Sequence, residues 1–442
     1  MKMNQREFLQ LCARGTYEEI EEAINNGASI NRRAMFNGSQ MYPLFVAVMK
    51  GNREAIEVLI KHRAKAIHGF MAAIIFNEKY LAQYMVYCGA DVNSRDAHNR
   101  TPLLCAVTAN NPEAVKWLIE LGANVNIKAG EGYNVLTYAA FMFAEENEYD
   151  EQTVKIIRIL MTSGADYREA MMAAIRFNDT ELVRLFIQNG ADVNEDCMPD
   201  RSPLTLALLN LQYDNDLTML KFLLKNGAET NEEFDFGDGI LTTNLNISIS
   251  MNHPIAAEML LDYGADPNFI DYKGRTPLMY GVLTGRDIAE TLLRHGADPD
   301  IGDGNGRTAL MFAAIDGEIE EGIIKDLLDA GADPDLQDDK GQTALMWAVA
   351  DRDRSPEILI SALIRTGGLR AEKGALWFSA AALFAAGKRE AQLNIVKTLI
   401  QYGADLTICD NKGVNAFMRA VMNFDDEIAG ILKSAGAVTP EL

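Results

Sequence analysis

The chain has 442 residues, 41 of them basic and 63 acidic, which gives a formal net charge of −22 at pH 7. This length exceeds the usual size of one globular core, so we expect either several domains or one extended array of repeats. So acidic a surface repels phosphate backbones, and no run of basic residues offsets it, which argues against direct nucleic-acid binding.

The N-terminal residues lack the apolar core of a signal peptide, and no stretch approaches the roughly 18 apolar residues of a membrane span. We therefore expect a soluble protein that does not insert into membranes. Five scattered cysteines never show the C-x-x-C spacing. We interpret them as reduced, small core side chains, which fits a cytoplasmic protein, although export into a host cell stays open.

A short phrase recurs along the chain: an amphipathic segment is followed by Gly-Ala and often by Asp or Asn, as in "YCGADVN", "QNGADVN" and "RHGADPD". Arg63 takes the place of the glycine in one copy. The positions of this anchor residue are Gly27, Arg63, Gly89, Gly122, Gly164, Gly190, Gly227, Gly264, Gly296, Gly331, Gly367, Gly403 and Gly436. A period near 33 residues is typical of stacked helical pairs.

Each repeat also carries signals for the start and end of its helices. Thr101-Pro102, Ser202-Pro203 and Thr276-Pro277 place a hydroxyl N-cap before a proline at the first helical position. A second helix follows after a polar turn, as in "AVKWLIELG". The anchor glycine then ends that helix in the left-handed conformation.

The order Asp-x-x-Gly-x-Thr-Pro-Leu, helix, turn, helix with Leu-Leu, and Gly-Ala-Asp resembles the ankyrin repeat, most clearly at Asp271–Asp300. The resemblance covers essentially the whole chain. It implies one all-α solenoid over residues 1–442, with about 13 helix-turn-helix repeats and short β-hairpin fingers. Residues 1–27 and 413–442 would then be the capping repeats. The usual His after Pro-Leu is replaced by Met279, Met311 and Met346, which indicates looser packing between repeats.

Two repeats are only 26 residues long, and their sequences match each other at an offset of 101 residues. This length is too short for the finger that joins neighbouring ankyrin repeats. We therefore predict that fingers are missing around Ala64–Gly69 and Asp166–Glu169.

The stretch "DPDIGDGNGRTALMFAA", which starts at Asp298, raises the alternatives of a calcium loop and a phosphate-binding loop. An EF-hand register fails because the twelfth position is Ala309, and "GNGRTA" has no buried strand before it. Neighbouring copies share the layout with different acids, so we predict turn residues. The repeated aromatics Tyr280, Phe312 and Trp347 are predicted to be core residues.

No metalloprotease, serine hydrolase or phosphate-loop motif is present, and the five histidines are dispersed. We therefore expect no enzyme, no metal and no cofactor. The finger residues, in contrast, vary from repeat to repeat. In ankyrin proteins, as the resemblance implies, such residues and the concave groove contact partner proteins. The candidates here are Arg95, His98, Arg100, Lys128, Tyr133, Met198, Arg201, Tyr272, Arg275, Asn305 and Arg307.

Three functions remain open at this point. The first is a protein-binding scaffold or inhibitor for an unknown protein partner, with the chain monomeric before it binds. The second is an acidic decoy that sequesters a nucleic-acid-binding protein, and the third is an enzyme with an unrecognised site. A fold alone does not choose between them. The arginines could also simply balance carboxylates of their own chain.

Overall fold

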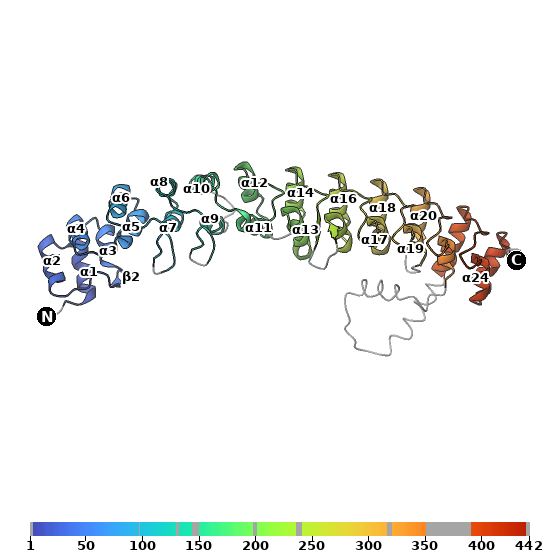
Figure 1. Cartoon of the computed structure of the whole chain (residues 1–442), viewed down its shortest axis with the longest axis horizontal. Coiled ribbons are helices and arrows are strands. Elements are labelled where there is room, and N and C mark those ends of the chain that lie inside the picture. Colours follow the sequence, from blue (N-terminus) through green and yellow to red (C-terminus); the bar gives the residue numbers. More distant parts are fainter. Residues whose placement is uncertain are drawn as a thin grey trace, which may run out of the picture. The chain divides into compact units, whose positions relative to one another are not determined.

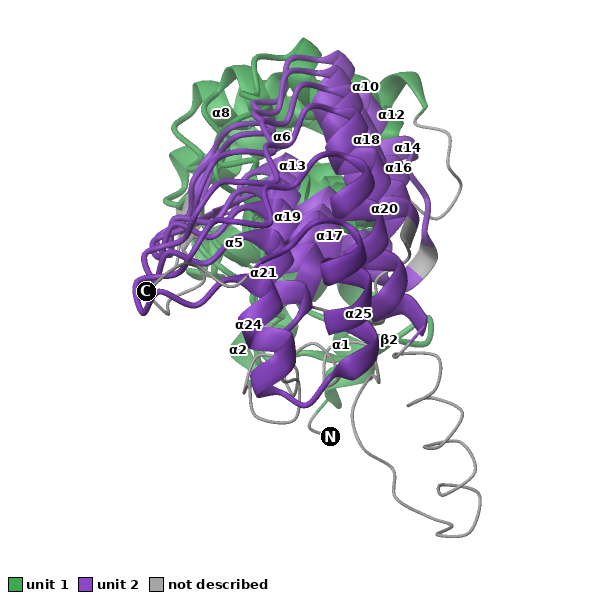
Figure 2. Cartoon of the chain, turned by 90° about the vertical axis from the view of Figure 1, so that its right-hand side faces the viewer, with its two compact units in different colours: residues 1–198 green, residues 199–442 purple. Residues whose placement is uncertain are grey.

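Short antiparallel helix pairs build the structure, a computed structural model that describes residues 3–96, 98–129, 132–143, 150–197, 201–235, 241–315, 321–350 and 390–438 (Figure 1). The chain divides into two compact units, residues 1–198 and 199–442 (Figure 2). Each unit is a stack of helix pairs, as expected for an all-α repeat fold.

The described helices and strands of the first unit are α1 (Gln5–Arg14), α2 (Tyr17–Asn25), β1 (Ala34–Phe36), β2 (Ser39–Met41), α3 (Pro43–Met49), α4 (Arg53–Lys61), α5 (Ala66–Ile75), α6 (Lys79–Tyr87), α7 (Pro102–Thr108), α8 (Pro112–Glu120), α9 (Val135–Phe143), α10 (Glu151–Thr162), α11 (Arg168–Arg176) and α12 (Thr180–Gln188). First helices of consecutive pairs pack in the series α1, α3, α5, α7, α9 and α11. The strands β1 and β2 form an antiparallel hairpin, the first finger.

The second unit contains α13 (Pro203–Asp214), α14 (Thr218–Lys225), β3 (Glu233–Asp235), β4 (Leu241–Thr243), α15 (Asn244–Ser250), α16 (Pro254–Asp262), α17 (Pro277–Thr284), α18 (Arg286–Arg294), α19 (Ala309–Ile315), α20 (Glu321–Asp329), α21 (Ala344–Ala348), α24 (Ala416–Met422) and α25 (Asp426–Ser434). Residues 390–401 are also helical. Here the first helices pack in the series α13, α15, α17, α19, α21 and α24, and β3 pairs with β4 in a second hairpin.

The helix boundaries follow the predicted capping signals. Thr101 precedes α7, and its hydroxyl accepts the backbone N–H of Leu104 at 3.2 Å. Thr276 also precedes its helix, α17, but its hydroxyl makes no capping hydrogen bond there. At the other end of the pairs, the anchor glycines adopt positive φ values, for example +92° at Gly264. Arg63 has the same left-handed conformation, with φ of +63°.

The two short repeats lack fingers, as predicted. Helix α4 ends at Lys61 and α5 begins at Ala66, while α10 ends at Thr162 and α11 begins at Arg168. These connections of four and five residues leave no length for a hairpin. The first unit therefore has two gaps in its row of fingers.

The sequence predicts one more repeat, anchored at Gly367, between the repeats anchored at Gly331 and Gly403. Gly367 itself lies outside the described residues. The layers on either side bond directly to each other: Asp405 N–H donates to Asp335 Oδ1 at 2.7 Å, and Asn411 N–H donates to the carbonyl of Lys340 at 3.0 Å. In the described residues, the turns after Gly331 and Gly403 are therefore direct neighbours.

A side chain two residues after the Gly-Ala-Asp turn, asparagine in the earlier layers, links consecutive layers. Asn268 Oδ1 accepts the N–H of Asp298 at 2.8 Å, and Asn268 Nδ2 donates to the carbonyl of Gly296 at 3.2 Å. In the later layers, Asp300 and Asp335 occupy this position and accept the corresponding N–H groups of Asp333 and Asp405. An ionised carboxylate has no proton to donate, so Asp300 and Asp335 cannot form the bond that Asn268 Nδ2 makes to a glycine carbonyl.

Replacing Asp335 with asparagine should therefore stabilise the second unit by about 1 kcal/mol, the usual net contribution of one hydrogen bond. Burial, with the nearby carboxylates of Asp333 and Asp405, raises the pKa of Asp335. A raised folded pKa means that stability falls as the pH rises through it, so the gain should be larger at pH 7 than at pH 4. Urea unfolding at the two pH values measures this. An equal or lower stability at pH 7 would contradict the account.

Candidate functional site

One aspartate holds each finger of the Asp-x-x-Gly-x type in the same conformation. Asp271 Oδ1 accepts the N–H groups of Lys273 and Arg275, both at 2.8 Å. Asp303 Oδ1 does the same for Asn305 at 2.9 Å and Arg307 at 3.0 Å. Because these bonds use the backbone, the side chains between them can vary without changing the turn. The same arrangement recurs at Asp96, Asp338 and Asp410.

Neighbouring fingertips of the second unit are joined by backbone hydrogen bonds. The N–H of Gly304 donates to the carbonyl of Lys273 at 2.8 Å, and that of Asp339 donates to the carbonyl of Asn305 at 2.9 Å. A Cβ atom on Gly274 would lie 2.4 Å from the backbone nitrogen of Gly304, so this close approach requires glycine. The tips consequently form one continuous edge, on which Tyr272, Lys273, Asn305, Lys340 and Lys412 are exposed.

The second oxygen of the finger aspartate accepts a bond from an aromatic side chain in two layers. Tyr280 Oη donates to Asp271 Oδ2 at 2.5 Å, and Trp347 Nε1 donates to Asp338 Oδ2 at 3.1 Å. Both rings are half-buried, whereas Phe312 is fully buried. The prediction that these aromatics are core residues is therefore right for Phe312 and incomplete for the other two, which also anchor their fingers.

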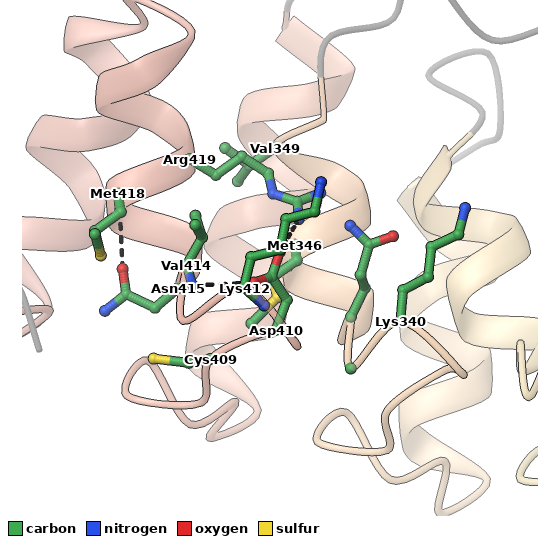
Figure 3. A network of polar contacts seen from close by, with 12 residues as sticks. Lys340, Met346, Val349, Cys409, Asp410, Lys412, Val414, Asn415, Met418 and Arg419 are labelled. Carbon is green, nitrogen blue, oxygen red and sulfur yellow. Dashed lines mark hydrogen bonds and ion pairs between the residues drawn. The ribbon is translucent and has the colours of Figure 1, made fainter.

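Arginine donates to the finger aspartate in three other layers. Arg419 donates to Asp410 at 2.9 Å (Figure 3), Arg100 to Asp96 at 2.8 Å and Arg307 to Asp303 at 2.8 Å. The Arg307 pair is the most buried, since only 10% of the arginine side chain and 1% of the aspartate side chain are exposed. Burial opposes ionisation of Asp303, but the hydrogen bonds from Arg307 and the turn outweigh it and lower its pKa.

Arg307 was predicted to be an exposed fingertip residue, and that prediction is wrong. Its guanidinium lies 4.7 Å from the centre of the Phe312 ring, and its Nε and Nη2 both donate to Asp303 Oδ2, at 3.1 and 2.8 Å. Here the alternative interpretation holds: the arginine balances a carboxylate of its own chain. Within the acidic stretch, Asp303 therefore holds the finger turn and pairs with Arg307, while Asp298 Oδ1 accepts the N–H of Asp300. Within the described ranges, no group of three His, Cys, Asp or Glu residues could hold a metal ion.

Arg275 occupies an intermediate position. Its guanidinium lies 5.2 Å from the Phe312 ring and 5.9 Å from the Tyr280 ring, so Phe312 contacts an arginine from each of two fingers. The side chain is half-buried, and its Nε has no hydrogen-bond acceptor among the described residues. Arg275 therefore remains a candidate contact, although a partner can reach only part of it.

The other candidates lie at several separate fingers. Arg95 and His98 are exposed, and Arg95 Nη1 donates to Asn99 Oδ1 at 2.6 Å. Lys128 pairs with Glu169 across the second gap in the fingers. Arg100 and Arg201 are half-buried, and Met198 lies outside the described residues.

Tyr133 and Tyr272 are the exposed aromatic candidates. The ring of Tyr133 packs edge-on against Phe141, with centres 5.5 Å apart. Tyr272 is 52% exposed, and the ammonium of Lys273 lies 5.1 Å from its ring centre. The structure thus brings Tyr272 and Asn305 onto one edge and leaves the candidates of the first unit on separate fingers.

Comparisons with known proteins agree with this architecture. A family model described as "Ankyrin repeats (3 copies)" matches residues 70–167, 141–234, 212–303 and 293–366, and one described as "Ankyrin repeats (many copies)" matches residues 8–60.

Among the part of the chain that the structure describes, no helix has the length and apolar character needed to cross a bilayer.

Three curated relatives illustrate the range of proteins that share these repeats. Human transient receptor potential cation channel subfamily A member 1 is 26% identical over 274 residues, covering 59% of this chain and 21% of that protein. Human ankyrin repeat and SOCS box protein 6 is 27% identical over 187 residues, covering 37% and 44%. Phosphocholine transferase AnkX of Legionella pneumophila is 23% identical over 181 residues, covering 40% and 18%. The chain spans less than half the length of each.

Proposed function

Because the chain belongs to the ankyrin-repeat family, whose repeats are generally protein-interaction modules, we propose that it is a stand-alone scaffold or inhibitor that binds a partner protein through its fingers and concave face. It acts as a monomer in the cytoplasm before binding. All five cysteines are free, which suits a reducing compartment.

The continuous fingertip edge of the second unit is the observation that carries this proposal. Its backbone is fixed by the finger aspartates and by bonds between tips, so little conformational entropy is lost on binding. One exposed tip position differs in every layer, as a surface that recognises one partner requires: Tyr272, Gly304, Asp339 and Asn411. The next position is lysine in three of the four layers. Tyrosine is enriched among the residues that dominate interface energies, and Tyr272 stands on this edge.

The proposal excludes catalysis by the repeats themselves. One relative is called a phosphocholine transferase, but the aligned region covers only 18% of that protein. No group of titratable side chains in the described residues points to a reaction, because the buried finger acids are engaged in holding turns.

An acidic decoy for a nucleic-acid-binding protein is the second candidate, and the distribution of charge favours the second unit for that role. Residues 199–442 carry 21 basic and 38 acidic side chains, a net charge of −17, whereas residues 1–198 carry 20 and 25, a net charge of −5. A decoy would bind through long-range attraction, which salt screens strongly. A partner held by fingertip packing would be far less sensitive to salt.

Affinity capture from cell extract at low and high salt, followed by mass spectrometry, tests both candidates. The scaffold predicts a protein that is retained at high salt. Release of every captured protein at high salt, with nucleic-acid-binding proteins prominent among them, would support the decoy instead. The captured protein then serves as the ligand for the fingertip variants discussed below.

A further inference from the structure

A group of exposed cations gathers at one corner of the first unit. Residues 31–70 contain seven Lys or Arg and only two Glu, in a chain whose net charge is −22. Arg32 and Arg33 precede β1, and Arg63 and Lys65 lie between α4 and α5. All four side chains are exposed. We call these four residues the basic corner.

One hydrogen bond brings the two pairs of cations together. The backbone N–H of Lys65 donates to Asn31 Oδ1 at 2.9 Å, which places Lys65 beside the start of the first finger. The four-residue connection between α4 and α5 carries no finger of its own, so no hairpin covers Arg63 and Lys65. The nearby Glu21 is occupied by Lys61 and His62, at 3.1 and 3.2 Å.

Arg63 has an unusual backbone conformation. It occupies the anchor position with φ of +63°, whereas every other described anchor is a glycine with φ between +80° and +103°. A side chain in the left-handed region is strained, so glycine would be the more stable choice here. Among the described residues, Arg63 forms no ion pair that would offset the strain. Strain without structural compensation points to a functional role for the side chain.

An uncharged pair of aromatic rings lies near Lys65 in the corner. The rings of Tyr42 and His68 stack beside it, with centres 3.6 Å apart and planes 6° from parallel. Burial, and then the charge of Lys65, lower the pKa of His68 to about 4. The histidine is therefore neutral at pH 7, and the stacked rings form an uncharged wall next to the four cations.

We propose that the basic corner binds an acidic segment of a partner protein. Guanidinium groups bind carboxylates in a bidentate geometry, and three of the four cations are arginines. A long nucleic acid fits less well, because the residues outside 31–70 carry a net charge of −27 and repel an extended polyanion. A second copy of the chain is repelled in the same way. The proposal rests on protein binding as the function but not on the fingertips.

Binding of a fluorescently labelled octaglutamate peptide to the full chain, followed by anisotropy, tests the proposal. Arg63→Gly should weaken binding roughly fivefold at low salt, as expected for the loss of one contact between unit charges in water. The same variant should melt at an equal or higher temperature, because glycine is unstrained at this position. A loss of binding without a loss of stability separates recognition from folding.

Two further variants serve as controls. Arg63→Lys keeps the charge and should retain most of the affinity. Arg158→Ala removes an exposed cation from α10 and should leave the affinity unchanged. An unlabelled octaglutamine peptide should not compete.

Several outcomes would overturn the proposal. The first is that the wild type and Arg63→Gly bind octaglutamate with equal affinity. The second is that an oligothymidylate binds more tightly than octaglutamate, which would assign the corner to nucleic acid. The third is self-association in light scattering that Arg63→Gly abolishes, which would assign the corner to a second copy of the chain. Loss of fingertip binding in Tyr272→Ala, with octaglutamate binding intact, would show that the two surfaces act separately.

Discussion

Arg307→Ala should destabilise the second unit by about 3 kcal/mol, because it leaves a buried carboxylate without its counter-ion. Asp303 is almost fully inaccessible, and it holds the finger turn through the N–H groups of Asn305 and Arg307. Urea unfolding monitored by circular dichroism measures the change. The same substitution at Arg100, whose side chain is 41% exposed, should cost about 1 kcal/mol or less.

The pH dependence of this effect identifies its cause. The pKa of Asp303 is lowered in the folded protein, so its stabilising contribution is present above the unfolded pKa and is lost as the pH falls through the folded value. In Arg307→Ala the unpaired carboxylate is costly only when ionised. The difference between wild type and variant should therefore shrink as the pH is lowered from 7 toward 3. A difference that does not change with pH would mean that lost packing on Phe312 dominates.

The double variant Tyr272→Ala, Asn305→Ala should weaken the complex with the captured partner by roughly 2 kcal/mol or more, about thirtyfold in Kd. The two residues lie on adjacent fingers of one rigid edge, and both side chains are exposed. Titration calorimetry gives the affinity. The fold should be unaffected, since exposed substitutions rarely cost more than about 0.5 kcal/mol.

A matched control for the fingertip experiment is Tyr213→Ala, which removes an equally large and more exposed ring from α13 in the same unit. Affinity should stay at the wild-type value in that variant. If the double variant binds as tightly as wild type, the fingertips are not the contact surface, and the inner helices or the outer helices become the candidates. Arg275 and Arg307 are unsuitable for this test, because their burial would make an effect on binding hard to separate from an effect on stability.

Much of the fold could be predicted from the sequence because its signals are local. Thr101 and Pro102 start a helix through groups within one turn of each other, and Gly264 ends one through its own backbone freedom. The missing fingers followed from repeat length alone. Repeat spacing alone does not show which layers are neighbours in space: only contacts between distant residues, such as Asp335 and Asp405, show this.

The site was harder to predict, and for the same reason. Arg307 and Asn305 are two residues apart on one finger, yet one side chain is buried and the other is exposed. The difference depends on Phe312, which the arginine covers, and on Asp303, which it neutralises. Arg63 did leave a signal, because it breaks a series of glycines. That signal became meaningful only when the backbone at Arg63 proved to be left-handed.

The bonds between fingertips also bear on how the molecule unfolds. A stack of repeats behaves as a one-dimensional array in which each layer is coupled to its nearest neighbours. In the second unit the tips add a line of coupling beyond helix packing, whereas α5 and α11 in the first unit lack fingers on the side of the preceding layer. Hydrogen exchange should therefore show the layers from α17 to α24 opening together, while in the first unit opening stops at α5 and α11. Two missing hairpins would thus divide one unit into independently opening blocks.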